Sequence, residues 1–319
     1  MSMFENIPKI EKPEFYIELG MRSAKRYASS RKLREKVKSR RIAELEIIKA
    51  DAFTRSVGGC IGKICSSFPT IDQLPIFYKE LLEAMVGINE LKVSIARMQG
   101  AAEKIESMAM DYKKRIKSSD TEYIAKKKRE FYGRAFSMLK KSKAAFSFAE
   151  NARKDLRQFP SIKTKILTIC ICGYPNVGKS TLLSKLTGSR PDIAPYAFTT
   201  RQLMIGYIAN KIQIIDTPGN FKEDFKKMNW IEKQSYLAIK HLCKKIIYVF
   251  DITETCGFTI SQQEELFNKL VKKFRAKQFS IYLSKSDMGL DKKQEFEDNN
   301  KNHKIFDDAD KLKAFLLED

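Results

Sequence analysis

Two patterns of hydrophobic and polar positions divide the chain near its middle. From about residue 14 to 155, apolar residues recur at helical spacing among many lysines and arginines, as at Leu33, Val37, Ile48 and Phe53, and glycines and prolines are few. Such spacing is typical of amphipathic helices that bury one face. We therefore expect the first half of the chain to be entirely helical.

The few helix-breaking stretches of this half predict where its helices end. Glycine pairs, serine- and proline-containing stretches and short polar links all interrupt helices. The run 78–112 has the length and pattern of one long amphipathic helix, and Thr121 can cap the helix that follows it. The expected breaks are Gly58-Gly59, 66–70 and 117–120.

After a boundary near residue 160, apolar strands alternate with amphipathic helices. Strands interleaved with helices predict a mostly parallel sheet that binds ligands at the carboxyl ends of its strands. We therefore expect an all-helical domain over 1–160 and an α/β domain over 161–319. The expected strands are 165–172, 202–208, 211–216, 245–250 and 278–284, the expected helices are 179–187, 230–243 and 261–275, and a short strand and helix follow His303.

The stretch between the first strand and first helix of the second half has the pattern Gly-x4-Gly-Lys-Ser. Glycine backbones let successive N–H groups point at an anion, and the helix that follows adds its positive N-terminal dipole. Lys179 would reach the β- and γ-phosphates of a nucleotide, and Ser180 would ligate Mg²⁺. The second half is therefore predicted to be a P-loop domain. The expected nucleotide contacts here are Gly173, Tyr174, Pro175, Asn176, Val177, Gly178, Lys179, Ser180 and Thr181.

Two further stretches lie where a GTPase senses the γ-phosphate. Thr200 occupies the switch I position, and we expect it to complete the Mg²⁺ shell. The stretch 216–219 closes an apolar strand, so its aspartate would hold Mg²⁺ through water and its glycine N–H would contact the γ-phosphate. Asp216, Thr217, Pro218 and Gly219 are all expected at the nucleotide. The predicted catalytic residues are Lys179, Thr200 and Gly219, and the predicted metal ligands are Ser180, Thr200 and Asp216.

The stretch 284–287 closes the next apolar strand and predicts which base is bound. The Asp287 carboxylate can accept hydrogen bonds from N1 and the exocyclic amine of guanine, which adenine cannot donate from the same edge. The stem of Lys285 would lie over the base plane. The usual first residue of this motif is Asn or Thr, and the final guanine-contacting loop of such domains matches 306–309 poorly. The expected base contacts are Ser284, Lys285, Ser286 and Asp287.

Two asparagines bear on the rate of hydrolysis. A water-orienting glutamine usually follows the glycine at position 219, but this chain has Asn220, which is shorter. We therefore expect slow hydrolysis without a partner or a second cation. Asn176 is suggestive, because GTPases activated by potassium carry asparagine at that place in the phosphate loop, so K⁺ is kept as a second candidate cofactor beside Mg²⁺.

The charge of the chain predicts a polyanionic partner. Its 319 residues carry a formal net charge of +21, and the first half is the more basic one. This favours nucleic acid over a membrane, with a solvated charged surface as the alternative. No apolar run is long enough for a membrane span or a signal peptide, so we expect a soluble intracellular protein. The spacing of the six cysteines predicts neither a zinc site nor a disulfide framework.

Several of these stretches together resemble the NOG-type nucleolar GTP-binding proteins, which belong to the Obg-related branch of GTPases. Many GTPases share the phosphate loop. The stretches Phe-Pro-Thr-Ile-Asp-Gln-Leu at 68–74 and Asp-x-x-Glu-x-Cys-Gly at 251–257 are more diagnostic. Further similar segments lie at 156–162, 195–200 and 231–242, and the resemblance covers most of residues 20 to 290.

The resemblance implies a Mg²⁺-dependent GTPase that binds ribosomal RNA and large-subunit precursor particles during ribosome assembly. Its basic helical domain would lie on the RNA. Eukaryotic members carry a long basic C-terminal extension, so this chain is similar to the short archaeal form. We accordingly expect a cytoplasmic monomer that binds neither DNA nor membrane. The candidate RNA contacts are Arg31, Lys32, Arg34, Lys126, Lys127, Lys128 and Arg129.

Two other functions fit parts of the same pattern. The first is a GTP-dependent protein-binding switch or scaffold with weak intrinsic hydrolysis, in which the basic domain binds an acidic protein. The second is a cation-dependent GTPase in tRNA modification, which would need a modification domain that the sequence does not show. Migration with ribosomal particles separates the assembly factor from both.

Overall fold

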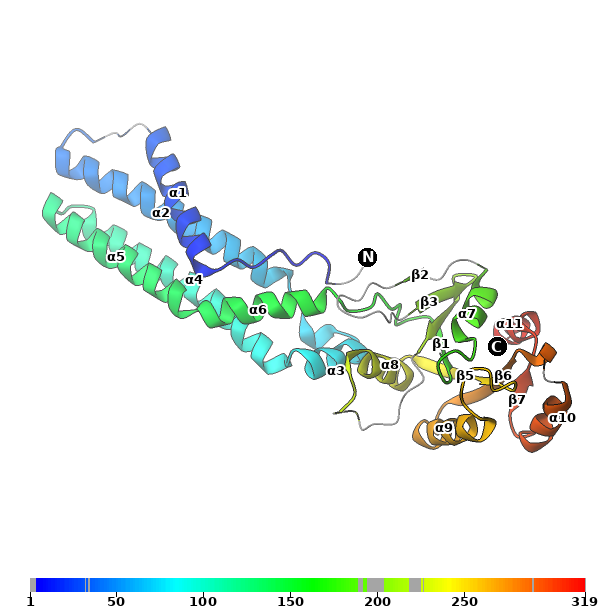
Figure 1. The fold of residues 1–319 in the computed structure, drawn as a ribbon. Coiled ribbons are helices and arrows are strands. Elements are labelled where there is room, and N and C mark those ends of the chain that lie inside the picture. The colour runs from blue at the N-terminus through cyan, green and yellow to red at the C-terminus, as the bar shows by residue number, and fades with distance from the viewer. Residues whose placement is uncertain are drawn as a thin grey trace. The chain divides into compact units, whose positions relative to one another are not determined.

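The computed structural model describes residues 4–31, 33, 35–188, 192–193, 204–217, 225, 227–288 and 290–318, in two compact units (Figure 1). Unit 1 comprises Met1–Gln73 and Val86–Phe159, and unit 2 comprises Leu74–Met85 and Pro160–Asp319. The last division lies beside the expected boundary near residue 160. Among the helices that the structure describes, none combines the length and the apolar composition that a membrane span requires.

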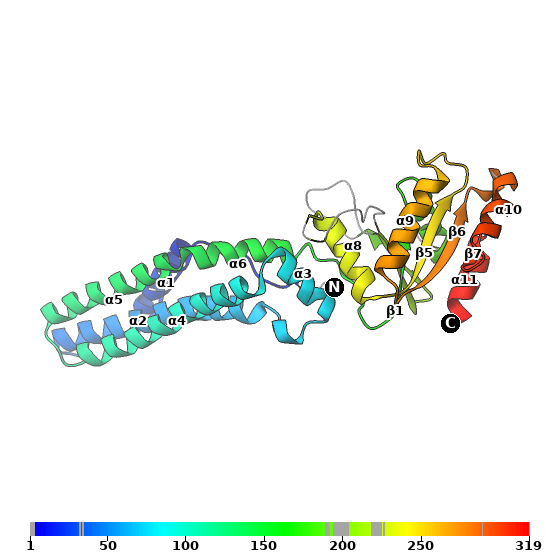
Figure 2. The same cartoon turned by 90° about the horizontal axis from the view of Figure 1, so that it is seen from below.

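Unit 1 is a bundle of long helices, drawn from blue to green in Figures 1 and 2. Its core is aromatic: the Phe53 ring lies edge-on to the Phe131 and Tyr132 rings, with centroids 6.2 and 5.4 Å apart. Gly20 lets α1 approach this core, since a Cβ there would lie 2.5 Å from the Phe53 ring. The helices are α1 (Pro13–Ser30), α2 (Lys38–Ser67), α4 (Ile88–Ile116), α5 (Thr121–Lys141) and α6 (Lys143–Leu156), with a 3₁₀ turn at Ile71–Gln73.

The expected break at Gly58-Gly59 is wrong, because α2 continues through both glycines. Phe53, Val57 and Ile61 are completely buried at helical spacing on either side of the pair. A glycine costs a helix only about 1 kcal/mol relative to alanine, which burial of these neighbours outweighs. Tertiary packing therefore overrides the local helix-breaking signal.

The region around residue 35 and the start of α5 also differ from expectation. Leu33 and Val37 lie between α1 and α2 and not in a helix, and Val37 is 54% exposed. Asp120, and not Thr121, caps α5, because its carboxylate accepts a hydrogen bond of 2.8 Å from the Tyr123 N–H. The breaks expected at 66–70 and 117–120 are confirmed.

The run 78–112 is two helices and not one. Helix α3 (Ile76–Met85) ends two residues before Gly87, which has φ +84° and precedes α4. Helix α3 belongs to unit 2, where it packs against α8 (Trp230–His241). The Tyr78 hydroxyl donates to the Pro160 carbonyl at 2.8 Å and accepts from the Ile162 N–H at 3.0 Å. The sequence pattern did not predict this assignment to the second unit.

Unit 2 is built on a seven-stranded sheet in the order β2-β3-β4-β1-β5-β6-β7. Strands β4, β1, β5, β6 and β7 run parallel, while β2 and β3 are antiparallel additions at one edge. The expected mostly parallel sheet is therefore confirmed. The strands are β1 (Leu167–Cys172), β2 (Asp192–Ile193), β3 (Met204–Ile208), β4 (Ile212–Asp216), β5 (Cys243–Asp251), β6 (Gln278–Ser284) and β7 (Lys304–Phe306).

Helices cover both faces of this sheet, as Figure 1 shows. Helices α7 (Lys179–Thr187) and α11 (Ala309–Glu318) pack against each other on one face, and α8 and α9 (Ile260–Lys273) pack against β5 on the other. Helix α7 has the bounds that the sequence predicted. The remaining helices of unit 2 are α7 (Lys179–Thr187), α9 (Ile260–Lys273), α10 (Leu290–Asn299) and α11 (Ala309–Glu318), with a 3₁₀ turn at Ser286–Met288.

Candidate nucleotide-binding site

The carboxyl ends of the central parallel strands bring the predicted site residues to one edge of the sheet. Asp216 at the end of β4 pairs in register with Ile171 of β1. At the ends of β5 and β6, Asp251 lies opposite Ser284. Ligands of parallel α/β sheets bind at this edge. The phosphate loop, the aspartate after β4 and the base motif are therefore placed on one side, as the sequence predicted.

The phosphate loop (residues 173–178) depends on backbone conformations that favour glycine. Gly173 has φ +144°, and a Cβ there would lie 2.7 Å from the Val249 carbonyl oxygen. Gly178 has φ +98° where the loop enters α7. Asn176 has φ +63°, a conformation that asparagine tolerates better than most residues. The loop thus keeps its backbone close to β5 and at the N-terminus of α7.

We expect Gly173→Ala to destabilise unit 2 by about 2 kcal/mol and to weaken GTP binding, because the added methyl group meets backbone that cannot move aside. Thermal unfolding and a GTP titration measure the two effects. Gly188→Ala is the matched control, since Gly188 also has positive φ (+65°) but a Cβ added there would have no neighbouring atom within 4 Å. Equal losses in both variants would show that φ alone, and not the close approach to Val249, makes Gly173 necessary.

The predicted phosphate and metal residues lie together at the start of α7. The Lys179 ammonium donates to the Tyr174 carbonyl oxygen at 2.7 Å, so it arches back over the phosphate loop. The Ser180 hydroxyl donates to Asp216 Oδ2 at 2.7 Å. Helix α7 and strand β4 therefore place a hydroxyl and a carboxylate oxygen side by side, in front of the loop that would hold phosphates.

This pair of oxygens fits Mg²⁺. Burial raises the pKa of the Asp216 carboxyl, and the Lys179 ammonium and the Ser180 hydrogen bond offset only part of that rise. A cation at this point would supply the missing positive charge, and Mg²⁺ prefers oxygen ligands of this kind. Ser180 would bind it directly and Asp216 through water. When bound, Mg²⁺ would neutralise charge on the β- and γ-phosphates.

Some predicted nucleotide contacts have their side chains turned into the protein. Thr217 is completely buried, and its hydroxyl donates to the Ile171 carbonyl at 2.9 Å. Val177 is completely buried as well. These two residues hold the loop and the end of β4 in place, and only their backbones remain for a nucleotide. Thr200, Pro218, Gly219 and Asn220 lie outside the described residues.

The base motif follows β6. Ser284 is buried and its hydroxyl donates to the Phe250 carbonyl at 3.0 Å, so this residue ties β6 to β5. Asp287 is exposed in the 3₁₀ turn Ser286–Met288, where its carboxylate can face a base. Lys285 has φ +54° and pairs with Asp251. The motif is thus held to β5 through Ser284 and Lys285, while Asp287 is exposed.

The poorly matching stretch 306–309 uses its carboxylates within unit 2. Asp307 forms an ion pair with Lys293 of α10. Asp308 Oδ1 accepts from the Asp310 and Lys311 N–H groups at 2.8 and 2.9 Å, and so caps α11. Both side chains therefore have structural partners that do not involve a base.

The sequence did not predict Asp251 as a residue of this site. Asp251 is completely buried and contacts Lys285 of the base motif, although the sequence marked it only as part of a family-like stretch. The available signal was its position: like Asp216, it is an aspartate that directly ends an apolar strand of the parallel sheet. Its partner could not be deduced from spacing, because Lys285 lies 34 residues further along the chain.

The predicted RNA-binding residues lie in unit 1, and their surroundings differ. Lys127 forms an ion pair with Glu130 at 2.7 Å, and Lys128 forms one with the buried Glu46 at 3.0 Å. Within the described residues, neither Lys126 nor Arg129 has an ion pair, and both are exposed. Arg31 is exposed after α1. Lys32 and Arg34 lie outside the described residues.

P-loop GTPases combine a phosphate loop after their first strand with an aspartate that reads the base after a later parallel strand. Unit 2 has this combination and is a domain of this class. Comparison with known families then gives the particular group. A model described as the NOG1 N-terminal helical domain matches residues 4–163, and one described as a 50S ribosome-binding GTPase matches residues 168–285. The chain belongs to the NOG1 family of GTPases, as its resemblance predicted.

Similar proteins come from an archaeon and from eukaryotes. An uncharacterized protein of Methanocaldococcus jannaschii is 33% identical over 274 residues, which are 86% of this chain and 78% of that protein. Nucleolar GTP-binding protein 1 of Saccharomyces cerevisiae is 36% identical over 229 residues, which are 70% of this chain but 35% of the yeast protein. The chain therefore spans about a third of the length of its yeast relative. A crystal structure of a nucleolar GTP-binding protein 1 from Plasmodium falciparum is 33% identical, covers 46% of this chain and 78% of that chain, and has a TM-score of 0.36.

Proposed function

We propose that this protein hydrolyses GTP to GDP and phosphate, and that it acts as an assembly factor of the large ribosomal subunit with unit 1 bound to ribosomal RNA. The observation that carries the first part is the Ser180–Asp216 pair of oxygens in front of the phosphate loop. The match of unit 2 to a model described as a 50S ribosome-binding GTPase supports the second part. A relative named as a nucleolar protein supports it too.

The charges of unit 1 favour RNA as the partner of that unit. The N-terminus of α2 and the junction of α4 with α5 lie at the same end of the bundle (Figures 1 and 2). Three basic residues and two acidic ones line one surface cavity at this end: Arg31, Arg40, Lys117, Glu35 and Glu44. Lys126 and Arg129 are exposed on the first turns of α5. Phosphate groups of an RNA backbone would complement this basic end of unit 1.

The state of the nucleotide would control the RNA-bound factor. A γ-phosphate and Mg²⁺ order the loops that sense them, and hydrolysis releases these loops. We propose Mg²⁺ as the cofactor, held by Ser180 and Asp216, with Thr200 as the third candidate ligand. The carboxylate of Asp287 would select guanine over adenine, because only guanine donates two hydrogen bonds from that edge.

Sedimentation of a native lysate through a sucrose gradient tests the assembly role. The protein should migrate with large-subunit precursor particles, and a non-hydrolysable GTP analogue should change the migrating fraction relative to GDP. A protein that stays at the top of the gradient with either nucleotide would contradict the proposal and favour a protein-binding switch. Crosslinking and sequencing of bound RNA would then identify the contacted helices.

We expect the double variant Lys126→Glu/Arg129→Glu to weaken RNA binding, because it reverses two exposed charges at the basic end of unit 1. Each lost phosphate contact should also reduce the slope of log affinity against log salt by about 1. Filter binding of ribosomal RNA at several salt concentrations measures both effects. The matched control is Arg97→Glu/Lys104→Glu, which reverses two exposed charges in the middle of α4. Equal losses in the two double variants would show that net charge, and not this end of unit 1, governs binding.

A further inference from the structure

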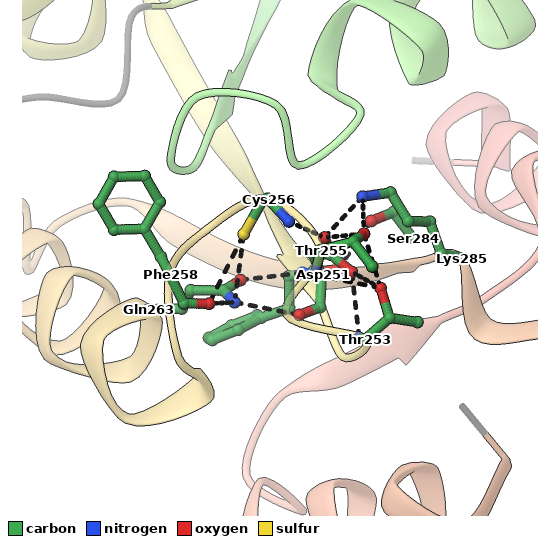
Figure 3. A network of polar contacts seen from close by, with 9 residues as sticks. Asp251, Thr253, Thr255, Cys256, Phe258, Gln263, Ser284 and Lys285 are labelled. Atoms are coloured by element: carbon green, nitrogen blue, oxygen red, sulfur yellow. Dashed lines mark hydrogen bonds and ion pairs between the residues drawn. The ribbon is translucent and has the colours of Figure 1, made fainter. Parts of the chain in front are cut away.

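The loop between β5 and α9, residues 251–259, is organised around one buried carboxylate. We call it the Asp251 loop. Asp251 Oδ1 accepts from the Thr253 N–H at 3.0 Å and from the Thr253 hydroxyl at 2.5 Å. Its Oδ2 accepts from the Cys256 N–H at 2.8 Å, from the Thr255 hydroxyl at 3.1 Å and from the Lys285 ammonium at 2.6 Å (Figure 3). Five donors therefore converge on a side chain that has no exposed surface.

This carboxylate remains ionised at neutral pH. Burial by itself would raise the pKa of Asp251, but the Lys285 ammonium and the Thr253 and Cys256 donors outweigh burial and hold the pKa at about 2. A buried charge that is paired and hydrogen-bonded in this way is stable only while its partners stay in place. The Lys285 ammonium is consequently fixed between Asp251 and the Thr255 hydroxyl, to which it also donates at 2.6 Å.

Helix α9 sets the position of Asp251 from the other side. Gln263 is completely buried, and its Oε1 accepts from the Asp251 N–H at 2.9 Å. Its Nε2 donates to the carbonyl oxygens of Asp251 and Phe258, each at 3.0 Å (Figure 3). One amide thus holds both ends of the Asp251 loop, so groups of the chain itself fix the position of the carboxylate.

The same loop also contacts the phosphate loop. The ring of Phe258 stacks on the ring of Tyr174, with centroids 4.0 Å apart and an interplanar angle of 23°. Gly178 approaches the base motif as well, since a Cβ there would lie 3.5 Å from Ser284 Cβ. The Asp251 loop therefore lies against the phosphate loop through Phe258 and against the base motif through Lys285.

We infer that Asp251 is a positioning residue that fixes Lys285 of the base motif and thereby sets the preference of the site for guanine nucleotides over adenine nucleotides. This inference rests on the proposed function, because it concerns the base of the nucleotide that unit 2 binds. A lysine side chain is flexible, and ordering it costs up to about 2 kcal/mol. The ion pair orders Lys285 before a nucleotide arrives, which leaves less to be ordered on binding.

The base selectivity depends on Lys285 because of its place in the chain. Its backbone has φ +54°, which is unfavourable for lysine, and Asp287 follows two residues later in the 3₁₀ turn. The ion pair of the Lys285 ammonium holds this backbone in place. It thereby fixes the position of the Asp287 carboxylate at the edge of the sheet. When the ion pair with Asp251 is lost, the stem of Lys285 no longer has a fixed position over the base plane. The position of the Asp287 carboxylate then becomes less well defined.

Asp251→Asn tests this inference, because it keeps the size of the side chain and removes its charge. Competition of unlabelled GTP and ATP against a fluorescent GTP analogue, with Mg²⁺ present, gives the affinity for each nucleotide. We expect about a 10-fold loss of GTP affinity with little change for ATP, as for a lost hydrogen bond to a charged group. A collapse of the whole site would instead weaken both nucleotides together and leave their ratio unchanged, which would overturn the inference.

A double-mutant cycle shows whether Asp251 acts through Lys285. In the Lys285→Ala background, Asp251→Asn should cost much less GTP affinity than it does in the wild type, because the group it positions is gone. Additive losses would overturn the inference. If Asp251→Asn does not fold, Thr255→Val takes its place in the cycle, since Thr255 contacts Lys285. Thr253→Val serves for comparison, because the Thr253 hydroxyl contacts Asp251 and the Thr255 hydroxyl but makes no direct contact with Lys285, so its loss should disturb Lys285 less.

The result for the wild type separates the two proposals. A wild-type protein that does not bind GTP contradicts the proposed function and the inference with it. A wild type that binds GTP, with an Asp251→Asn variant of unchanged GTP-to-ATP ratio, leaves the proposed function standing and overturns only the positioning role of Asp251.

Discussion

The Lys179→Ala variant should bind GTP about 100-fold more weakly than the wild type, which corresponds to about 2.7 kcal/mol. Lys179 begins α7, and its ammonium already lies over the phosphate loop through its hydrogen bond to the Tyr174 carbonyl. A triphosphate would offer this ammonium charged oxygens in place of a neutral carbonyl, and such charge-assisted bonds are roughly twice as strong. Calorimetric titration with GTP and Mg²⁺ measures the loss.

Lys185→Ala is the matched control for this prediction. Lys185 lies on the same helix, is exposed, and stands in the last turn, away from the phosphate loop. Its removal should leave GTP affinity within a factor of 2 or so, as for most surface substitutions. If Lys179→Ala also bound GTP as the wild type does, the assignment of 173–181 as the phosphate-binding stretch would be wrong.

The parts of this site that the sequence predicted are those that local chain geometry determines. A strand, a glycine turn and a helix follow each other without interruption from Leu167 to Thr187, so the spacing of the motif is also its structure. The aspartate at the end of β4 and the one in the turn after β6 were placed by the same logic, since parallel strands end at a common edge of the sheet. Each of these predictions needed only the order of elements along the chain.

The parts that the sequence did not predict depend on contacts between distant residues. Gly58 and Gly59 look like a helix break, and only the burial of Phe53, Val57 and Ile61 explains why α2 continues. The role of Asp251 depends in the same way on Lys285, which follows another strand. Periodicity shows that a position is buried, but it does not show which side chain lies against it.

Helix α3 is the largest such case, because the chain between Gln73 and Val86 leaves the helical unit and returns to it. The chain thus passes between the units three times, and α3 packs on α8, the helix that follows the stretch 216–219, which the sequence predicts to sense the γ-phosphate. Glu80 of α3 forms an ion pair with Lys240 at 2.8 Å, and its Oε2 lies 3.0 Å from His241 Nε2. Ion pairs at a partly exposed carboxylate contribute at most about 1 kcal/mol, so the apolar residues of α3 must supply most of the attachment.

Leu81→Ala should therefore lower the stability of unit 2 by about 3 kcal/mol and leave that of unit 1 nearly unchanged, because Leu81 is completely buried on α3. Hydrogen exchange measured by mass spectrometry on the whole chain distinguishes the units, since peptides from β1 and β5 should lose protection while peptides from α2 and α5 keep it. Ile76→Ala is the matched control, because Ile76 stands on the same helix but is 59% exposed. Loss of protection confined to α2 and α5 would instead assign α3 to the helical unit.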